Sequence, residues 1–211
     1  MSKVSVFEEN VDFYEEWFDN NNHILNSEIE AIRQVLPDTG EGVEIGAGTG
    51  IFSQHLGIKK GIEPSAKMRE KARARGINAI AGTAENLPFL DSTYDYALMV
   101  TVDCFLDDII RAFKEVRRII APNGHFIIAF IDRDSALGKI YNQNKSSSEF
   151  YKYAEFHSSE EIENWLVEAG FQIIDQRQTV FTLENRTQEI RRGVGEGLFA
   201  VIKAQKYSSV D

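Results

Sequence analysis

The sequence has few of the residues that mark secreted, membrane-spanning or metal-bound proteins. It has 211 residues with one cysteine and four prolines, and its 23 basic side chains are outnumbered by 33 acidic ones. A single cysteine forms neither an intrachain disulfide nor a cysteine-rich zinc site. The longest clearly apolar run, residues 126–131, is far shorter than the roughly 20 residues of a membrane helix, and the N-terminus lacks the apolar core of a signal peptide.

The shortage of basic residues also bears on partners. A formal net charge of −10 argues against a protein that holds nucleic acid or an anionic membrane through bulk electrostatics. The apolar content of 43% excludes wholesale disorder. We therefore expect a cytoplasmic monomer or homodimer that forms a single domain over residues 1–211, with no nucleic acid and no membrane among its partners.

Strand and helix patterns alternate along the chain. Seven strands are predicted, at residues 43–46, 60–63, 77–81, 94–101, 124–131, 171–182 and 197–206. Helices are predicted at residues 8–20, 27–36 (with Ser27 as N-cap), 50–56, 65–75 (with Ser65 as N-cap), 107–120 and 158–169. Alternation implies right-handed crossovers, hence a doubly wound α/β fold with a mostly parallel seven-stranded sheet. The last two strands have no helix between them, which predicts a hairpin and an antiparallel last strand.

The most informative segment is VEIGAGTGIF at residues 43–52, where a strand runs into Gly46, Gly48 and Gly50. Ligands bind at this place in a doubly wound sheet. The spacing is G-x-G-x-G, whereas the dinucleotide fingerprint is G-x-G-x-x-G, and no Lys-Ser/Thr pair follows as in a phosphate loop. Glu63 closes the second strand, where an acid binds the hydroxyls of a ribose. The ligand should carry a free ribose and need no phosphate cradle.

Five motifs occur in an order that resembles class I S-adenosylmethionine (SAM)-dependent methyltransferases, in particular the small-molecule branch of the ubiquinone/menaquinone-biosynthesis type. They are the acid-x-G-x-G-x-G segment from Glu44, the acid Glu63, GTAENLPF at residues 82–89, Tyr94-Asp95, and the basic helix end with P-x-G before a strand at residues 117–130. The resemblance is strong over residues 40–132. It implies a Rossmann-like methyltransferase fold and a SAM cofactor that donates a methyl group to a small-molecule acceptor by direct displacement.

The resemblance also implies a set of cofactor contacts. Gly46 and Gly48 would face the methionine part, Glu63 the ribose, and Thr101 the floor under the sulfonium. Thr83 stands where the family usually has an Asp that binds the adenine amino group. The full set is Tyr14, Glu44, Gly46, Ala47, Gly48, Glu63, Pro64, Met68, Thr83, Ala84, Glu85 and Thr101.

Three of these contacts have an alternative interpretation. Glu44 would either approach the amino group of the cofactor or fix the glycine loop. Met68 would pack on the adenine or simply belong to the core of its helix. Tyr14 matches an aromatic residue that reaches over the cofactor in related enzymes, or it forms an apolar stripe with Trp17 and Phe18.

An acceptor-side base is useful only if the acceptor arrives protonated. The candidates are Asp103 and Asp132, which both follow strands at the ligand-binding edge, although acids there often just cap turns. None of the four histidines shows metal-ligand spacing, so no metal site is predicted. His157 lies next to a predicted substrate-side segment.

The resemblance divides the chain into an N-terminal helical cap (1–40), a cofactor core (41–132), a substrate-side insertion (133–157) and a C-terminal helix with a strand hairpin (158–211). Two other classes of function remain open at this point. One is an NAD-binding oxidoreductase on a similar sheet, and the other is a non-catalytic module that keeps the fold. The identity of the acceptor is not encoded in any motif.

Overall fold

The computed structural model describes residues 3–207. Its helices are α1 (Lys3–Glu9), α2 (Val11–Asn20), α3 (Asn22–Arg33), α4 (Ile51–Leu56), α5 (Ala66–Ala74), α6 (Ile109–Ile119), α7 (Ala136–Asn144) and α8 (Ser159–Glu168), with 3-10 turns η1 (Asp103–Phe105), η2 (Lys145–Ser147) and η3 (Tyr151–Tyr153). Its strands are β1 (Gly42–Ile45), β2 (Lys60–Ile62), β3 (Asn78–Ile80), β4 (Tyr94–Val100), β5 (Ile120–Ile131), β6 (Phe171–Thr179), β7 (Arg191–Arg192) and β8 (Phe199–Lys206).

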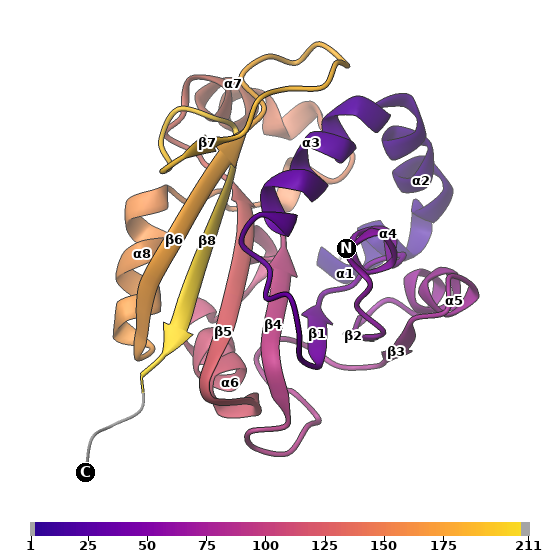
Figure 1. Cartoon of the computed structure of the whole chain (residues 1–211). Helices are drawn as coiled ribbons and strands as arrows, with labels where there is room; N and C mark the ends of the chain where they lie inside the picture. The colour runs from indigo at the N-terminus through magenta and orange to yellow at the C-terminus, as the bar shows by residue number, and fades with distance from the viewer. Residues whose placement is uncertain (1–2, 208–211) are drawn as a thin grey trace.

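One sheet runs through the molecule, in the order β3-β2-β1-β4-β5-β8-β6-β7 (Figure 1). The pairs from β3 to β5 are parallel, and β8 is antiparallel to both β5 and β6. The predicted α/β class, the mostly parallel sheet and the antiparallel last strand are therefore confirmed.

The predicted count of seven strands is wrong by one, because eight are present among residues 3–207. The additional strand is β7, only two residues long, which pairs with Arg177 and Gln178 of β6. It arises because the connection from β6 to β8 folds back along the edge of the sheet. The sequence pattern of this connection shows no strand periodicity, so two paired residues could not be foreseen.

The N-terminal boundaries also differ from the prediction. The helix expected over 8–20 is two helices that meet at Asn10, whose φ of −121° and ψ of 30° are not helical. The next helix begins at Asn22, so Ser27 lies inside it and is not its N-cap. The Ser27 hydroxyl instead donates to the His23 carbonyl one turn earlier, at 2.9 Å. Ser65 does cap α5, since its Oγ accepts from Met68 N at 3.2 Å.

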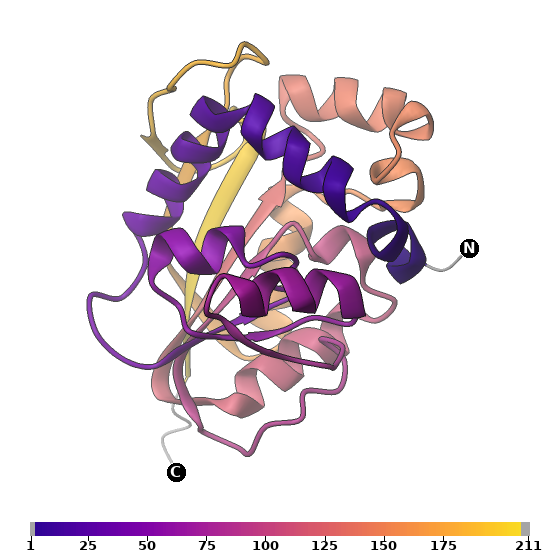
Figure 2. The same cartoon turned by 90° about the vertical axis from the view of Figure 1, so that its right-hand side faces the viewer.

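Helices cover both faces of the sheet in two apolar layers. On one face α3 and α4 bury residues such as Ile32 and Phe52, and on the other α6 and α8 bury residues such as Phe113 and Leu166. Burial of such side chains stabilises the fold by about 1.5–3 kcal/mol each. Figure 2 shows α4 and α5 in front of the sheet and α6 behind it. The layers leave the carboxyl ends of the parallel strands to be covered by other segments.

Those carboxyl ends are covered by three segments from distant parts of the sequence. Residues 3–20, which we call the N-terminal cap, lie beside the segment that contains α7, η2 and η3 (Figures 1 and 2). The loop between β6 and β8 lies above the same edge. The helix α7 was not expected; it begins where the Ser135 hydroxyl accepts from Gly138 N at 3.0 Å.

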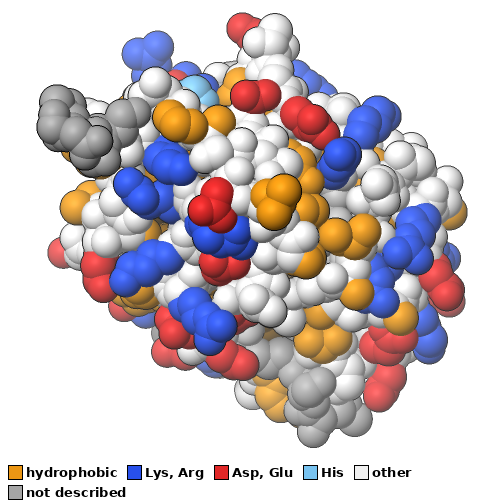
Figure 3. All heavy atoms as spheres, turned by 90° about the horizontal axis from the view of Figure 1, so that it is seen from below, with side chains coloured by type: hydrophobic (Ala, Val, Ile, Leu, Met, Phe, Trp, Pro, Cys, Tyr) orange, Lys and Arg blue, Asp and Glu red, His pale blue; other side chains and the backbone are white. Residues whose placement is uncertain are grey.

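Charges of both signs are mixed on the outside. On the face seen from below, Lys and Arg side chains are interspersed with Asp and Glu side chains (Figure 3). Ion pairs such as Lys60–Glu41 at 2.9 Å and Arg118–Asp91 at 2.8 Å join neighbouring side chains of opposite charge. Among residues 3–207, no helix is both long enough and apolar enough to cross a membrane.

Candidate cofactor and acceptor site

The glycine loop turns sharply between β1 and α4. Gly46 has φ of 74° and Gly48 has φ of 54°, in the left-handed region that favours glycine. A Cβ on Gly46 would also overlap the Val102 side chain, which follows β4. The loop therefore lies directly against the carboxyl end of β4, with its backbone exposed to a ligand at that edge.

Glu63 ties this loop to the end of β2. Its Oε2 accepts from Gly48 N at 2.9 Å, and its Oε1 accepts from Ser65 N at 2.8 Å. Burial raises the pKa of Glu63, and these two amides act in the opposite direction. Each carboxylate oxygen still has a lone pair to accept another donor. A pair of oxygens held rigidly in this way suits the two hydroxyls of a ribose, so the residues present fit such a ligand.

Glu44 lies beneath the loop, with 1% of its surface exposed. Its carboxyl accepts a hydrogen bond from the Ser53 hydroxyl of α4. Burial raises the pKa of Glu44 to about 8, against the effect of that hydrogen bond. This arrangement favours the second of the two roles expected for Glu44, which is to fix the loop to α4. The neighbouring Ala47 is also enclosed, with 5% exposed.

Tyr14 of α2 reaches over the glycine loop. Its hydroxyl oxygen lies 3.4 Å from the position that a Cβ on Gly48 would occupy. Burial raises the pKa of Tyr14, and the nearby carboxyls of Glu44 and Glu63 raise it further. Its ring packs edge-on against Phe18 at 5.0 Å between centroids. Tyr14 therefore packs in the N-terminal cap with its hydroxyl beside the glycine loop, and its contact with the cofactor stays a prediction.

The remaining expected contacts are divided between enclosed and open positions. Met68 and Ala84 are buried, whereas Pro64 and Thr83 are exposed. The Glu85 carboxylate accepts from Asp107 N at 3.1 Å and so supports the segment that leads into α6. The structure brings the glycine loop, Glu63 and Tyr14 together.

Thr101, at the end of β4, has a strained backbone. Its φ of 51° is uncommon for a residue with a β-branched side chain. Its amide donates to the Ala129 carbonyl of β5 at 2.8 Å, so the distorted residue is held in the sheet. Strain of this kind costs about 1–3 kcal/mol and is found mostly at ligand sites.

Asp103 and His157 form a pair just beyond β4. His157 Nδ1 lies 3.0 Å from Asp103 Oδ2, and the imidazole packs edge-on against Trp165 at 4.9 Å. Asp103 is 2% exposed; burial raises its pKa, and the hydrogen bond with His157 opposes that effect. A carboxyl that holds Nδ1 leaves Nε2 of the imidazole available to accept a proton.

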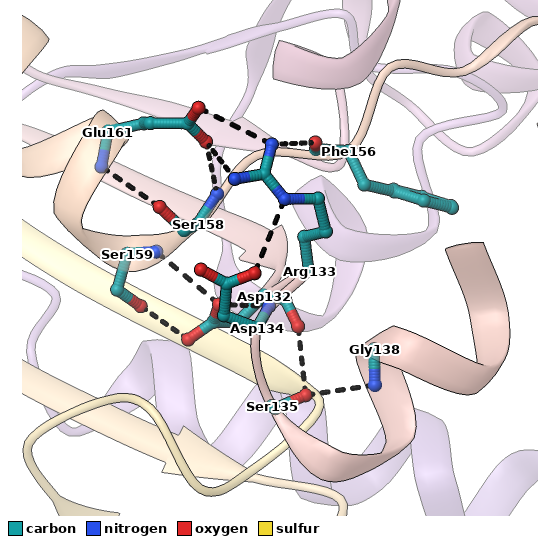
Figure 4. A network of polar contacts seen from close by, with 9 residues as sticks. All are labelled: Asp132, Arg133, Asp134, Ser135, Gly138, Phe156, Ser158, Ser159 and Glu161. Atoms are coloured by element: carbon teal, nitrogen blue, oxygen red, sulfur yellow. Dashed lines mark hydrogen bonds and ion pairs between the residues drawn. The ribbon is translucent and has the colours of Figure 1, made fainter. Parts of the chain in front are cut away.

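Asp132 is engaged differently, in a network at the end of β5 (Figure 4). Its Oδ2 accepts from Ser159 Oγ at 2.6 Å and its Oδ1 from Asp134 N at 3.1 Å. Beside it, Arg133 forms an ion pair with Glu161 at 2.9 Å. These contacts join β5 to the first turn of α8. They favour a structural role for Asp132 over the catalytic one that its position suggested.

The family that matches residues 16–176 is described as "Methyltransferase domain". The chain belongs to this methyltransferase family. A solved structure from Thermotoga maritima, described as a SAM-dependent methyltransferase and possible histamine N-methyltransferase, is 44% identical with a TM-score of 0.94, covering 97% of this chain and 100% of that chain. An uncharacterised protein of Methanocaldococcus jannaschii is 40% identical over 96% of this chain and 100% of that protein.

A more distant relative lies in the branch that the motifs resemble. A demethylmenaquinone methyltransferase of Corynebacterium kroppenstedtii is 27% identical over 53% of this chain and 53% of that protein. The enzyme is a methyltransferase and its cofactor is SAM. This membership decides against the nicotinamide cofactor and the non-catalytic module that the sequence alone left open.

The methyltransferase holds its N-terminal cap against α5 through acids on one side of the cap. Glu8 Oε2 accepts from the Ser65 hydroxyl at 2.5 Å, at the start of α5. At the start of α2, Asp12 Oδ1 lies 3.2 Å from Lys71 Nζ, near the end of α5. The side chain of Asp12 is almost fully exposed, so this second pair contributes little by itself.

The third contact joins two side chains that are both largely buried. Arg75 Nη2 lies 2.5 Å from Glu15 Oε2, and Arg75 Nη1 donates to the Thr49 carbonyl at 2.9 Å. Arg75 therefore joins the cap to the glycine loop. Acids at positions 8, 12 and 15 follow helical spacing, which is the signal that could have identified them in the sequence.

Aromatic rings from the N-terminal cap, from η1 and from residues 133–157 pack against one another beside the candidate site. Phe150 stacks on Phe7 at 5.5 Å and on Phe13 at 5.7 Å. Tyr151 stacks on Phe105 at 6.3 Å. We call this set the aromatic cover; its members are Phe7, Phe13, Tyr14, Phe105, Tyr141, Phe150 and Tyr151.

Two polar groups near the cover escaped the sequence analysis. His157 was not linked to Asp103, because 54 residues separate them. Glu28 of α3 was not noted at all, although it stands between Ile24 and Ile32, which are both buried. An acid in an otherwise apolar helical row is the signal that could have identified it.

Proposed function

We propose that this enzyme transfers a methyl group from SAM to a small-molecule acceptor that binds beneath the aromatic cover. The observation that carries the proposal is the hydrogen bond from Gly48 N to Glu63 Oε2. It holds the Glu63 carboxylate rigidly beside the open glycine loop, where the carboxylate can accept hydrogen bonds from hydroxyl groups. The description of the Thermotoga relative, which names a small molecule as its possible acceptor, supports it further. Residues 133–157 complete the acceptor side.

In this proposal the chain mainly positions its ligands. Glu63 holds the ribose, Gly46 and Gly48 leave room for the methionine part, and Tyr14 covers them. When bound, SAM supplies a methyl group activated by its sulfonium. Alignment of two reactants is worth roughly 7–11 kcal/mol of the barrier, and a closed cover also excludes water from the site. The other expected contacts, Ala47, Pro64, Met68, Thr83, Ala84 and Thr101, are proposed to line this cofactor site.

We assign the role of proton acceptor to His157, positioned by Asp103. With Nδ1 bonded to the Asp103 carboxyl, Nε2 is the nitrogen that takes up the proton that the acceptor loses. A His157→Asn variant should lower kcat by about a hundredfold while the affinity for S-adenosylhomocysteine (SAH) stays unchanged. An equal loss of SAH binding would mean that the pair is only structural.

Titration calorimetry with SAH, the demethylated cofactor, tests the cofactor site. Glu63→Ala should weaken SAH binding by about tenfold or more, since it removes two charge-assisted hydrogen bonds. The matched control is Glu41→Ala, at the other end of β1, where the Glu41 side chain forms an ion pair with Lys60 at the surface. No binding of SAH at millimolar concentration, or the same loss in both variants, would contradict the proposal.

A further inference from the structure

The contacts between the N-terminal cap and the α5 segment keep an almost constant offset in sequence. Each contact joins residues that are 59 or 60 positions apart, namely Glu8 with Lys67, Asp12 with Lys71, and Glu15 with Arg75. The first is a hydrogen bond from the Lys67 amide to the Glu8 carboxylate at 3.2 Å, and the other two are ion pairs. We call these three contacts the ladder. The constant offset means that the cap runs along α5 in the same direction, with three of its acids turned toward that helix.

A groove of about 480 Å³ lies between the cap and α5. Most of the side chains that line it are charged: Glu8, Glu9 and Asp12 from the cap, and Lys67, Glu70 and Lys71 from α5. The two segments therefore meet across a polar groove, where exposed ion pairs contribute little to stability. Segments with few buried apolar contacts open locally at a small cost in free energy. The ladder is thus a weak attachment that can part and re-form.

The other end of the cap is a fixed joint. Asn21, between α2 and α3, has φ of −123° and ψ of 36°, which interrupts the helix. The side chain of Asn185 bridges this joint, because it donates to the Asn20 carbonyl at 2.8 Å and accepts from His23 N at 3.0 Å. Just before the joint, Phe18 is buried in the core. A cap that is anchored at Asn21 and weakly attached along α5 has the form of a hinged lid.

The ladder reaches both of the loops that are proposed to hold the cofactor. At one end, the Ser65 hydroxyl donates to Glu8, and the Ser65 amide donates to Glu63 Oε1 at 2.8 Å. At the other end, Arg75 Nη1 donates to the carbonyl of Thr49 in the glycine loop at 2.9 Å. Direct hydrogen bonds therefore join the position of the cap to the geometry of these two loops.

The cap closes over the proposed cofactor site in this conformation. The Tyr14 hydroxyl stands 3.4 Å from the position of a Cβ on Gly48, and 7% of Glu63 is exposed. We expect a ligand as large as SAM to reach Glu63 after the cap has moved aside. The closed state also has a cost, since Glu15 Oε1 and Thr49 Oγ1 are buried without a hydrogen-bond partner among residues 3–207. Lifting the cap lets water reach the Glu15 oxygen, which offsets part of the lost contacts.

We propose that the N-terminal cap is a lid, latched on α5 by the ladder, which swings about Asn21 to admit SAM and to release SAH. This inference rests on the proposed function and assigns the step that controls exchange at its cofactor site. Because the cap is also closed in the free protein, the lid changes the rates of entry and release by the same factor and leaves the affinity nearly unchanged. Because the latch is partly ionic, salt weakens it, so exchange should be faster at high ionic strength.

The test links the cap to α5 covalently. Asp12→Cys and Lys71→Cys place two thiols where an ion pair spans the groove, and a short bismaleimide joins them; Cys104 is buried and does not compete. Surface plasmon resonance on the immobilised protein measures the association and dissociation rates of SAH before and after linking. Both rates should fall by about tenfold or more, while Kd should change by less than about threefold.

The matched control is the double variant Glu41→Cys and Lys60→Cys, linked by the same reagent. It replaces a surface ion pair of 2.9 Å that joins the segment before β1 to β2, away from the cap. Neither rate should change when this pair is linked.

A second variant, Glu15→Gln, removes the charge of the most buried ladder contact and keeps the size of the side chain. It should raise both rates by about fivefold at low salt, with little change in Kd. The rates of wild type should rise between about 50 and 500 mM salt, and those of Glu15→Gln should rise less. Equal rates and equal salt dependence in the two proteins would show that the ladder is not the latch.

The outcomes separate the lid from the proposed function. If SAH does not bind the unlinked protein, the proposed function fails. If SAH binds and linking leaves both rates unchanged, the lid is overturned while the methyl-transfer proposal stands. The same conclusion follows if linking changes the dissociation rate alone and with it Kd, or if the control pair slows exchange equally.

Discussion

Replacing Glu28 by Gln should make the ligand-free protein more stable, by an amount that grows with pH. The pKa of Glu28 is raised by burial from 4.5 to about 8. Between these values the folded protein retains a proton that the unfolded chain has lost, so wild-type stability falls as pH rises. The glutamine does not titrate. The difference between variant and wild type should therefore be near zero at pH 4.5 and reach its maximum above pH 8.

The magnitude follows from the same two values. Each pH unit of the interval is worth roughly 1.4 kcal/mol, which gives up to about 5 kcal/mol in total. Because the side chain keeps some contact with solvent, we expect about 2–3 kcal/mol. Urea unfolding at intervals from pH 5 to pH 9 measures it. Glu30→Gln serves as control, with a change below about 0.5 kcal/mol at every pH. A difference for Glu28→Gln that does not vary with pH would refute the reasoning.

Three further changes test the site around it. Gly46→Ala should lower the free energy of unfolding by about 2 kcal/mol or more and abolish SAH binding, because the added Cβ overlaps the Val102 side chain. Intact SAH binding, measured by calorimetry, would contradict this. Thr101→Asn should raise the free energy of unfolding by about 1 kcal/mol, since Asn tolerates a positive φ better than Thr does. A lower melting temperature of the variant would argue against backbone strain at Thr101. Arg75→Ala removes the ion pair that ties Glu15 of the N-terminal cap to α5, so the rate of SAH release should rise about tenfold in a stopped-flow experiment. An unchanged rate would show that the cap does not control release.

The parts of the site that sequence could predict are those made by local chemistry. Gly46, Gly48 and Glu63 were predictable because a strand, a tight turn and an acid at the next strand end occupy fixed places in a doubly wound sheet. Ser65 was predictable as a cap because its hydroxyl bonds an amide only three residues away. Ser27 has the same chemistry but bonds backward to His23, and nothing local distinguishes the two cases.

The parts that sequence could not predict depend on distant contacts. Asp103 meets His157 only because the segment before α8 runs beside the turn after β4; Glu155 N donates to the Cys104 carbonyl there, at 2.9 Å. Phe150 meets Phe7 and Phe13 only after residues 133–157 and the N-terminal cap have packed together. Such neighbours are set by the packing of whole elements, which no spacing rule encodes.

The N-terminal cap touches both halves of the site at once. Its Tyr14 lies over Gly48 of the glycine loop, and its Phe7 and Phe13 stack on Phe150 of the proposed acceptor side. A ligand that orders the cap from either side therefore reduces the conformational entropy that the protein loses when the other ligand binds. Cofactor and acceptor should bind with positive cooperativity, and by linkage each should tighten the other by the same factor.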